Sequence, residues 1–239
     1  MTQHFKQKLS AVALGSAIAL ASGSASAYNL YSENGSELNL DIEAVVGTFS
    51  SQENYFGKTG DGSDWQEGYL KAGFSGSHDI NDSAAVYGGI NFVSSGTWGD
   101  GDAGGNSDGS ERRTALEDAF MGVRAGMVDL SIGRQNFSIG DGFLINGDAL
   151  NLGEGVFPDS NRGGAYWQAA RNTFDKTAIA RIGGEDGLRG DLFYLGHDNK
   201  AQTEVELGGV NVAYVTENGS LGYNYFQGLD AAGDARSDG

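Results

Sequence analysis

The chain has 239 residues, a formal net charge of −17 at neutral pH, 40 glycines, one proline and no cysteine. The excess of acidic groups argues against nucleic acid or anionic lipid as a partner, because both need a positive surface, and the lack of cysteine excludes disulfides. The many glycines and aromatic residues, with almost no proline, favour long β-strands.

The first 27 residues have the three parts of a secretory signal peptide. Lys6 and Lys8 give a positively charged N-terminal region, Ala11–Leu20 is an apolar run, and Ala25-Ser26-Ala27 is a cleavage site of small residues. The apolar run is shorter than the ~20 residues that a membrane-spanning helix needs. We therefore expect cleavage after Ala27 and a mature chain of residues 28–239. An ordinary amphipathic helix is the alternative.

Apolar and polar residues alternate with a period of two along the rest of the chain. In residues 38–50, Leu38, Leu40 and Ile42 alternate with Asn39 and Asp41. A period of two predicts strands, and no helical spacing competes with it. We count about nine segments, each long enough for the ~9–11 residues of a tilted membrane strand. They centre on residues 38–50, 69–74, 86–92, 118–124, 128–134, 178–182, 188–194, 210–214 and 221–225.

The connections between these segments alternate between long and short, which is typical of outer-membrane barrels with short periplasmic turns. Strands in lipid must close on themselves to satisfy their backbone hydrogen bonds. The predicted fold is therefore all-β, an antiparallel transmembrane β-barrel in a Gram-negative outer membrane, in contact with lipid and lipopolysaccharide. A secreted soluble β-protein is the alternative. The long acidic connections are Ser51–Asp64, Ser95–Arg113 and Ser138–Ala165, and the short ones are Ser77–Ser83, the Gly126 turn and Gly184–Gly187.

Seven charged residues fall on the polar side of their predicted strands, so a barrel would direct them into its lumen. A lumen with both signs of charge is expected of a diffusion pore. The alternative is that these groups only solvate a water-filled interior or pair across it. The predicted pore-lining residues are Asp41, Glu43, Asp118, Arg124, Arg181, Arg189 and Asp191.

Arg134 has the opposite parity, because it shares its side with Val128, Leu130 and Ile132. An arginine at the lipid midplane would cost ~2–4 kcal/mol. We therefore predict that Arg134 lies at the upper membrane interface or follows a β-bulge. Trp65, Trp98 and Trp167 are expected near strand ends, in an aromatic girdle or in loop packing.

No metal, cofactor or catalytic site is expected. Asp100 and Asp102 begin like a calcium loop, but Gly104 stands where a third oxygen ligand is needed. Weak binding of divalent ions by the acidic loops is the alternative. Of the two mature histidines, His78 and His197, neither lies near a G-x-S-x-G pattern. We expect no enzyme, with an outer-membrane hydrolase that uses His197 as the minor alternative.

One part of the sequence resembles known families. The stretch Leu116–Val123, the turn at Gly126 and the ending Gly133-Arg134-Gln135 resemble a strand-turn-strand unit of many Gram-negative porins. The two stretches after it, Gly140–Ile145 and Arg171–Ala178, resemble the alginate-export family of outer-membrane barrels. The resemblance covers about residues 116–182, roughly a third of the mature chain.

This resemblance implies a monomeric barrel of about 18 strands that conducts a polysaccharide or another anionic solute through an arginine-lined pore. The matched positions are Arg134, Asp141, Arg171 and Asp175. The acidic mature chain and its polar ending depart from that pattern, and we interpret the chain as the front portion of a longer barrel.

The sequence thus predicts a porin for passive diffusion of small hydrophilic solutes, anionic or saccharide, with Ser138–Ala165 narrowing the pore. A structural or adhesive barrel with acidic ion-binding loops is the alternative. The oligomeric state stays open.

Overall fold

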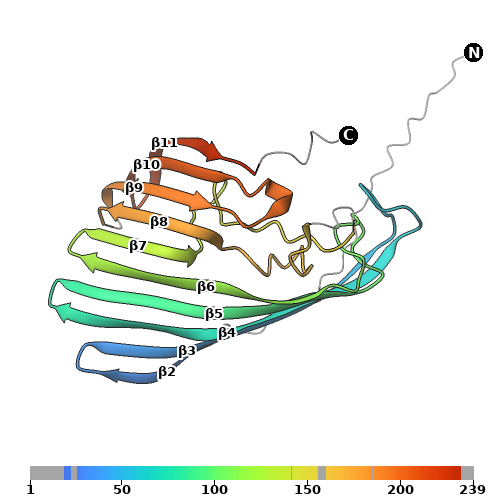
Figure 1. Cartoon of the computed structure of the whole chain (residues 1–239), viewed down its shortest axis with the longest axis horizontal. Helices are drawn as coiled ribbons and strands as arrows, with labels where there is room; N and C mark the ends of the chain where they lie inside the picture. Colours follow the sequence, from blue (N-terminus) through green and yellow to red (C-terminus); the bar gives the residue numbers. More distant parts are fainter. Residues whose placement is uncertain (1–18, 23–25, 141, 156–159, 185, 233–239) are drawn as a thin grey trace, which may run out of the picture.

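The computed structural model describes residues 19–22, 26–140, 142–155, 160–184 and 186–232. They form one antiparallel sheet whose strands follow one another in chain order, except that β1 and β2 both pair with β3 (Figure 1). This confirms the predicted all-β, antiparallel fold. The strands are β1 (Ala19–Ser22), β2 (Ser26–Glu33), β3 (Ser36–Ser51), β4 (Ser63–Asn81), β5 (Ala84–Gly99), β6 (Arg112–Ala125), β7 (Val128–Gln135), β8 (Phe174–Ile182), β9 (Gly187–Gly196), β10 (Glu206–Thr216) and β11 (Gly219–Asp230).

The nine predicted segments correspond to β3 through β11, while β1 and β2 were not predicted. The β2–β3 hairpin turns at Asn34 and Gly35, whose φ angles of 53° and 70° are those of a tight two-residue turn. A bulge between Asn29 and Tyr31 interrupts the alternation of β2, so its period was not visible in the sequence. Of the predicted signal peptide, residues 1–18 and 23–25 lie outside the described part of the chain.

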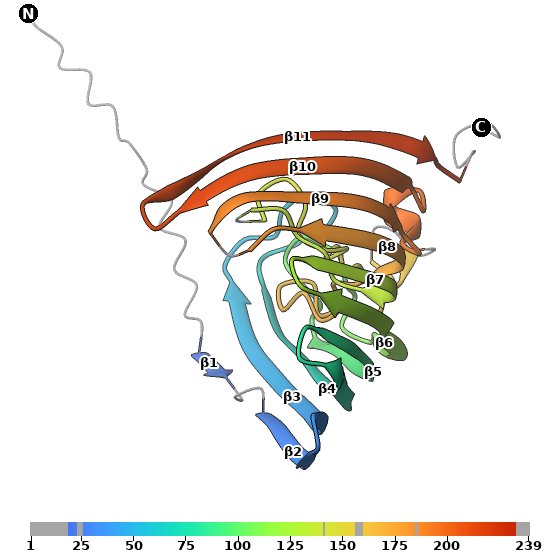
Figure 2. The ribbon, with the colours of Figure 1, turned by 90° about the vertical axis from the view of Figure 1, so that its left-hand side faces the viewer.

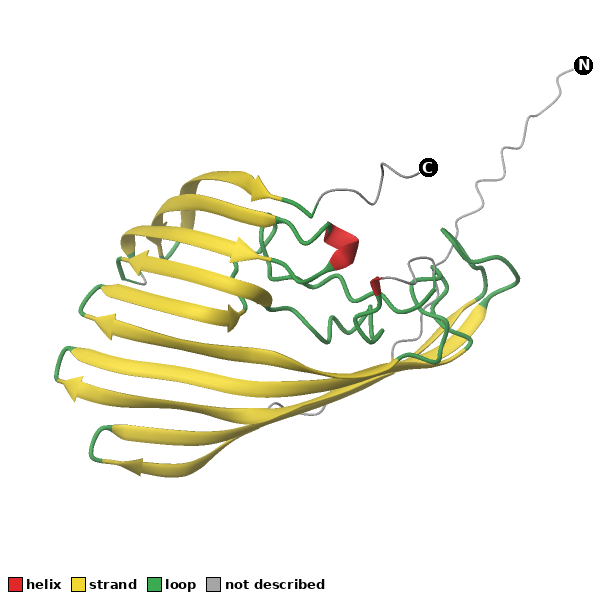
Figure 3. Cartoon of the chain, viewed as in Figure 1, coloured by secondary structure: helices red, strands yellow, loops and turns green. Residues whose placement is uncertain are grey.

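Short turns lie at one end of the sheet and long connections at the other (Figure 3). The long ones cover residues 52–62, 100–111 and 136–173, close to the predicted ranges. The predicted loop at Ser95 begins later, because the β4–β5 ladder continues to the pair Trp65–Gly99. A 3-10 helix, η2 (Lys200–Gln202), lies between β9 and β10.

The sheet curves around these connections (Figure 2). We call the side that the connections contact the inner face, and residues 136–173 the inner loop. Among the described residues no pairing joins β11 to β1 or β2, so the sheet is open. No helix in the same ranges is long and apolar enough to cross a membrane.

The outer face carries large apolar side chains that remain exposed. Register places Met121 beside Ile132, and Val123 beside Leu130, so these side chains share one face. Met121 is 65% exposed and Leu192 is 63% exposed. We call this set the apolar belt: Leu38, Ile42, Val46, Leu70, Phe74, Ile90, Phe92, Met121, Val123, Leu130, Ile132, Ile182, Leu188, Leu192, Val212, Tyr214, Leu221, Tyr223 and Tyr225.

A bulge in β8, opposite the end of β7, lies beside Arg134. The β7–β8 register shifts between Gly133 and Gln135. Gly133 has a φ of 118°, which a residue with a side chain rarely adopts. Arg134 is only 7% exposed. Arg134 therefore lies both beside a bulge and at the long-connection end of β7, and its place relative to a membrane interface stays a prediction.

Part of the inner face is apolar, because the inner loop covers it. Phe137, Ile139 and Ile145 of the loop pack with Phe174, Ile179, Phe193 and Leu195 of β8 and β9. The rings of Phe137 and Phe193 lie 4.9 Å apart. Since none of these seven side chains is more than 8% exposed, the loop is a packed part of the fold.

Candidate functional site

The strand register places all seven predicted pore-lining residues on the inner face. Across the sheet, Asp41 pairs with Gly73, Gly73 pairs with Asn91, and Asn91 pairs with Asp118, so Asp41 and Asp118 lie on the same face. Arg124 aligns through Asp129 with Arg181, and Arg181 aligns with Asp191. Glu43 is two residues from Asp41, and Arg189 is two residues from Asp191, so they share the same face.

Most of these charges are paired along the face. Arg124 and Asp129 are joined at 3.0 Å, and Arg181 lies 3.5 Å from Asp191. Asp191 also accepts a hydrogen bond from Asn211 at 2.6 Å. These contacts join neighbouring strands along one face, and paired groups give a weaker field than separate ones. Whether the charges line a pore stays a prediction.

Two charged partners were missing from the prediction. Lys71 forms a 3.0 Å ion pair with Asp118, and Asp129 also accepts a hydrogen bond from the Tyr87 hydroxyl. Both lie on the polar parity of their strands, so the period-two pattern already contained the signal for them.

Glu67 is a buried carboxylate that holds the inner loop against β4. It is 0% exposed and accepts hydrogen bonds from the backbone N–H groups of Trp167 at 2.8 Å and Gln168 at 3.3 Å. The indole of Trp65 donates a third bond at 3.3 Å. A buried carboxyl group needs such partners, so this contact fixes the position of the loop turn.

Glu117 makes a second attachment, from β6. A register shift between Asn91 and Phe92 opposite this strand leaves Glu117 without a pairing partner in β5. Its carboxylate, in a residue that is 0% exposed, accepts from the N–H groups of Asn172 at 2.6 Å and Thr173 at 3.1 Å.

The third attachment is Glu111, just before β6. It accepts from the N–H groups of Asp108 at 2.6 Å, Gly109 at 3.0 Å and Glu154 at 3.0 Å, and so joins two long connections. Gly153 passes so close that a Cβ there would collide with the Glu111 side chain. The glycine therefore permits the approach.

A network of arginines and carboxylates lies beside these attachments. Asp198 is its centre, 2.9 Å from Arg134, 3.4 Å from Arg162 and 3.5 Å from Arg171. Arg162 also pairs with Asp148 at 2.8 Å. Because Asp148 accepts bonds from Asn199 and Gln202 as well, the network connects the inner loop to the β9–β10 connection.

Three of the four positions matched to the alginate-export family meet in this network. Arg134 pairs with Asp175 at 2.6 Å, and Arg171 pairs with Glu117 at 3.1 Å. The fourth, Asp141, lies outside the described residues. The side chains of Arg134 and Arg171 are 8% and 3% exposed. They therefore anchor the loop instead of facing open water, unlike the arginines that the resemblance implies for a pore wall.

His197 belongs to the same network. Its Nδ1 lies 3.3 Å from Asp148, and its ring packs edge-on against Phe174 with centroids 4.9 Å apart. Its side chain is only 6% exposed. These contacts give the histidine a packing role beneath the inner loop.

Acidification is expected to loosen the network at Asp198. Burial alone would raise the pKa of this carboxyl, but the guanidinium groups of Arg134, Arg162 and Arg171 outweigh burial and hold the pKa below its usual value. A carboxyl with a depressed folded-state pKa adds stability above its unfolded pKa of about 3.9, and this stability is lost as pH falls through the folded value.

We therefore expect Asp198→Asn to lower the urea unfolding midpoint at neutral pH and to change it much less under strong acid. The measurement is tryptophan-monitored unfolding of wild type and variant at both pH values. An equal difference at the two pH values would contradict the role of the charge.

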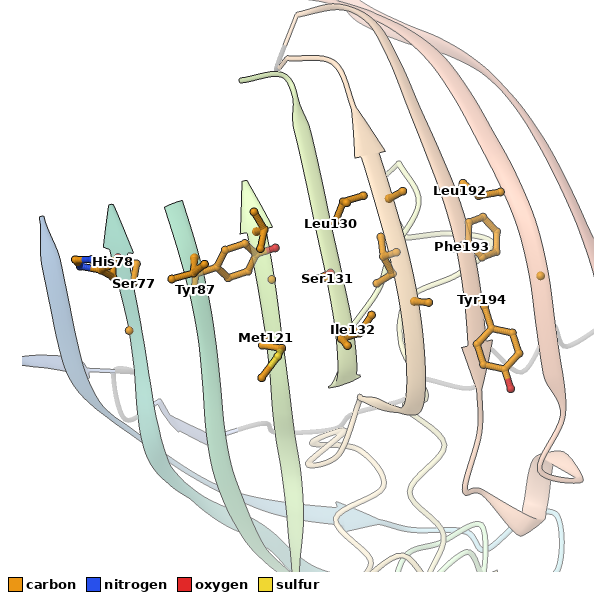
Figure 4. Close-up of a pocket in the computed structure, with 18 of the residues that line it drawn as sticks. Ser77, His78, Tyr87, Met121, Leu130, Ser131, Ile132, Leu192, Phe193 and Tyr194 are labelled. Atoms are coloured by element: carbon orange, nitrogen blue, oxygen red, sulfur yellow. The ribbon is translucent and has the colours of Figure 1, made fainter. Parts of the chain in front are cut away.

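A hollow of about 1140 Å³ follows the turn-proximal half of the sheet (Figure 4). Its lining includes Met121, Gly122 and Val123, which are consecutive in one strand. Consecutive strand residues point to opposite faces. The hollow is therefore the curvature of the sheet itself and includes part of the apolar belt, instead of being a separate binding cleft.

The acidic connections hold no group of three or more metal-ligating side chains within the described ranges. In the segment compared with a calcium loop, Asp102 is 0% exposed and accepts bonds from Gly104, Asn106 and Ser107. Its oxygens are used to shape the turn of the chain.

The comparisons with known proteins do not identify a family. No family model matches the chain, and no curated protein matches its sequence. The functional argument therefore rests on the two faces of the sheet and on the anchored inner loop.

Proposed function

We propose that the chain forms part of the wall of an outer-membrane β-barrel porin that lets small hydrophilic solutes diffuse passively, with the inner loop narrowing the passage. The apolar belt would contact lipid and lipopolysaccharide, and the inner face would line the passage. The barrel itself is part of the proposal, and neither a cofactor nor catalysis is required.

The observation that carries the proposal is the division of the sheet into two faces. The apolar belt spans β3 to β11 and stays exposed, although soluble proteins rarely expose apolar patches of more than a few hundred Å². The opposite face holds ion pairs such as Lys71–Asp118 and Arg124–Asp129. An apolar exterior with a polar interior is the arrangement of membrane barrels.

The strand ends give further support. Short turns at one end and long connections at the other match barrels with short periplasmic turns. The inner loop folds onto the inner face, where Glu67 and Glu117 attach it. A loop held inside a barrel reduces the open cross-section and so limits solute size.

Planar-bilayer conductance of the purified protein across a salt gradient tests the proposal. We expect discrete steps, with the reversal potential reporting which ions pass. Block by oligo-uronates would support an anionic-saccharide solute, and cation-leaning steps without block would indicate a general porin governed by its acids. If the protein is folded and heat-modifiable but gives no conductance steps, the proposal of a porin is contradicted.

A structural or adhesive barrel is the second candidate, favoured by the dense packing of the inner loop. The cluster of Phe137, Phe174 and Phe193 fills part of the interior, and a filled lumen would not conduct. Folded protein without conductance but with surface binding through its acidic loops is the outcome that this candidate predicts.

A charge placed in the apolar belt tests the lipid contact. Met121→Arg is expected to destabilise the membrane-inserted protein by ~2–4 kcal/mol, because the guanidinium would enter hydrocarbon. Asp41→Arg, on the inner face, is the control and should change stability little. Urea unfolding in lipid vesicles measures both. Equal effects of the two substitutions would argue against a lipid-facing belt.

A further inference from the structure

We propose that an aromatic pocket at the loop end, lined by Tyr55, Phe56, Tyr166 and Trp167, binds the ring of a neutral saccharide. The inference rests on the proposed porin function and deepens it, because it names the class of solute that would be captured at the passage entrance.

The pocket is formed where four connections meet, since Ala201 of the β9–β10 connection also lines it. Tyr55 and Phe56 come from residues 52–62, Asn106 from residues 100–111, and Tyr166 and Trp167 from the inner loop. Its volume is about 410 Å³, within the range of small-molecule sites. The rings of Tyr166 and Trp167 are 5.3 Å apart and nearly perpendicular, at 85°. Together they give the pocket two differently oriented aromatic surfaces.

The aromatic side chains are exposed although their backbone is firmly held. Trp167 is 47% exposed, but its N–H donates to the buried Glu67 at 2.8 Å. The N–H of Ala165 donates to the Thr97 hydroxyl at 2.9 Å. On the other side, the N–H of Tyr55 donates to the carbonyl of Ala103 at 2.8 Å. Attachment of exposed aromatic groups from beneath is a feature of pre-organised binding sites.

Backbone strain also concentrates around the pocket. Phe56, Ala165 and Ala169 have φ angles of 58°, 56° and 46°, in the left-handed region that residues with side chains rarely adopt. Such strain tends to persist at ligand-contacting sites, where the surrounding contacts maintain it. The surrounding contacts thus hold Phe56 and the Tyr166–Ala169 turn in backbone conformations that are locally unfavourable.

The charges around the pocket disfavour an anionic ligand. Among the described residues that line the pocket, none is charged. The nearby Asp102 is buried, and its two oxygens already accept hydrogen bonds from the protein, so they are not free to bind a ligand directly. An anion would be repelled by the acidic connections on either side.

The remaining polar groups suit a sugar. Tyr55 supplies a phenol hydroxyl that can donate and accept hydrogen bonds. Asn106 adds an amide that both donates and accepts. A pyranose ring has an apolar C–H face, which stacks on aromatic rings, and hydroxyl edges, which need such polar groups.

Isothermal titration calorimetry of the detergent-solubilised protein tests the proposal, with maltotriose and cellotriose as neutral probes and trigalacturonate and choline as charged ones. We expect saturable binding of at least one neutral trisaccharide and none of the charged probes. Trp167→Ala should weaken that binding roughly tenfold or more, as the removal of an aromatic anchor does. Trp98→Phe is the matched control and should bind as wild type, because Trp98 packs against Arg112 outside the pocket.

Tyr55→Phe keeps the ring and removes only the hydroxyl, so it tests the site even if Trp167→Ala disturbs folding. We expect it to weaken saccharide binding less than Trp167→Ala does. Unchanged binding in both variants, or saturation by choline or trigalacturonate alone, would overturn the proposal. Conductance without saccharide binding would refute this site but not the porin, whereas saccharide binding without conductance would refute the porin and leave the site.

Discussion

Glu117→Gln is expected to destabilise the folded protein by roughly 3 kcal/mol, the lower end of the cost of breaking a buried ion pair. Glu117 is 0% exposed, and its partner Arg171 is 3% exposed. The neutral amide leaves the guanidinium with only the more distant Asp198, at 3.5 Å. It also weakens the bonds from Asn172 and Thr173, so the end of the inner loop should loosen. Urea unfolding in vesicles, followed by tryptophan fluorescence, measures the loss.

Two variants make this result interpretable. Glu37→Gln changes an exposed carboxylate on the same face and should have little effect, since exposed charges contribute little. Adding Arg171→Met to Glu117→Gln should recover part of the stability, because it removes the unpaired buried charge. If Glu117→Gln is as stable as Glu37→Gln, the anchoring role of this carboxylate is wrong.

Removal of residues 141–155 from the inner loop is expected to raise single-channel conductance roughly twofold or more, because the open cross-section and the groups lining it control ion flow. The removed part includes Ile145 of the inner apolar cluster and Asp148 of the charge network. Arg162 loses Asp148 but keeps Asp198 at 3.4 Å, so its charge retains one partner. Planar-bilayer recordings at high salt measure the change.

Removal of Thr59–Asp61, three exposed residues of another long connection, is the control for loop shortening in general. It should leave conductance near the wild-type value. Unchanged conductance after removal of residues 141–155, in protein that still folds and inserts, would show that the inner loop does not constrict the passage.

The sequence by itself determined the strands and the faces of the sheet. Side-chain direction in a strand reverses at every residue, so alternation such as Leu38, Leu40 and Ile42 against Asn39 and Asp41 predicts both the strand and its two sides. For the same reason the seven predicted inner residues do share one face. The short turns were predictable because their glycines, such as Gly126, adopt positive φ angles.

Bulges mark the limit of that pattern. A single inserted residue changes the parity of every later residue in its strand. The parity of Arg134 made a bulge one of two predictions, whereas no sequence signal indicated the bulge at Glu117. The register shifts next to Gly133 and Asn91 are properties of two paired strands, so they appear only when the sheet is assembled.

The anchoring of the inner loop was decided by the tertiary structure alone. Glu67 and Trp167 are 100 residues apart in sequence, and Glu117 and Asn172 are 55 apart, yet each pair shares a buried hydrogen bond. Parity shows which way Glu67 points but not what covers it. The aromatic pocket has the same origin, because its residues come from four connections with no period of their own. The face to which a strand side chain points follows from the local sequence. Contacts between distant loops depend on the curvature of the whole sheet.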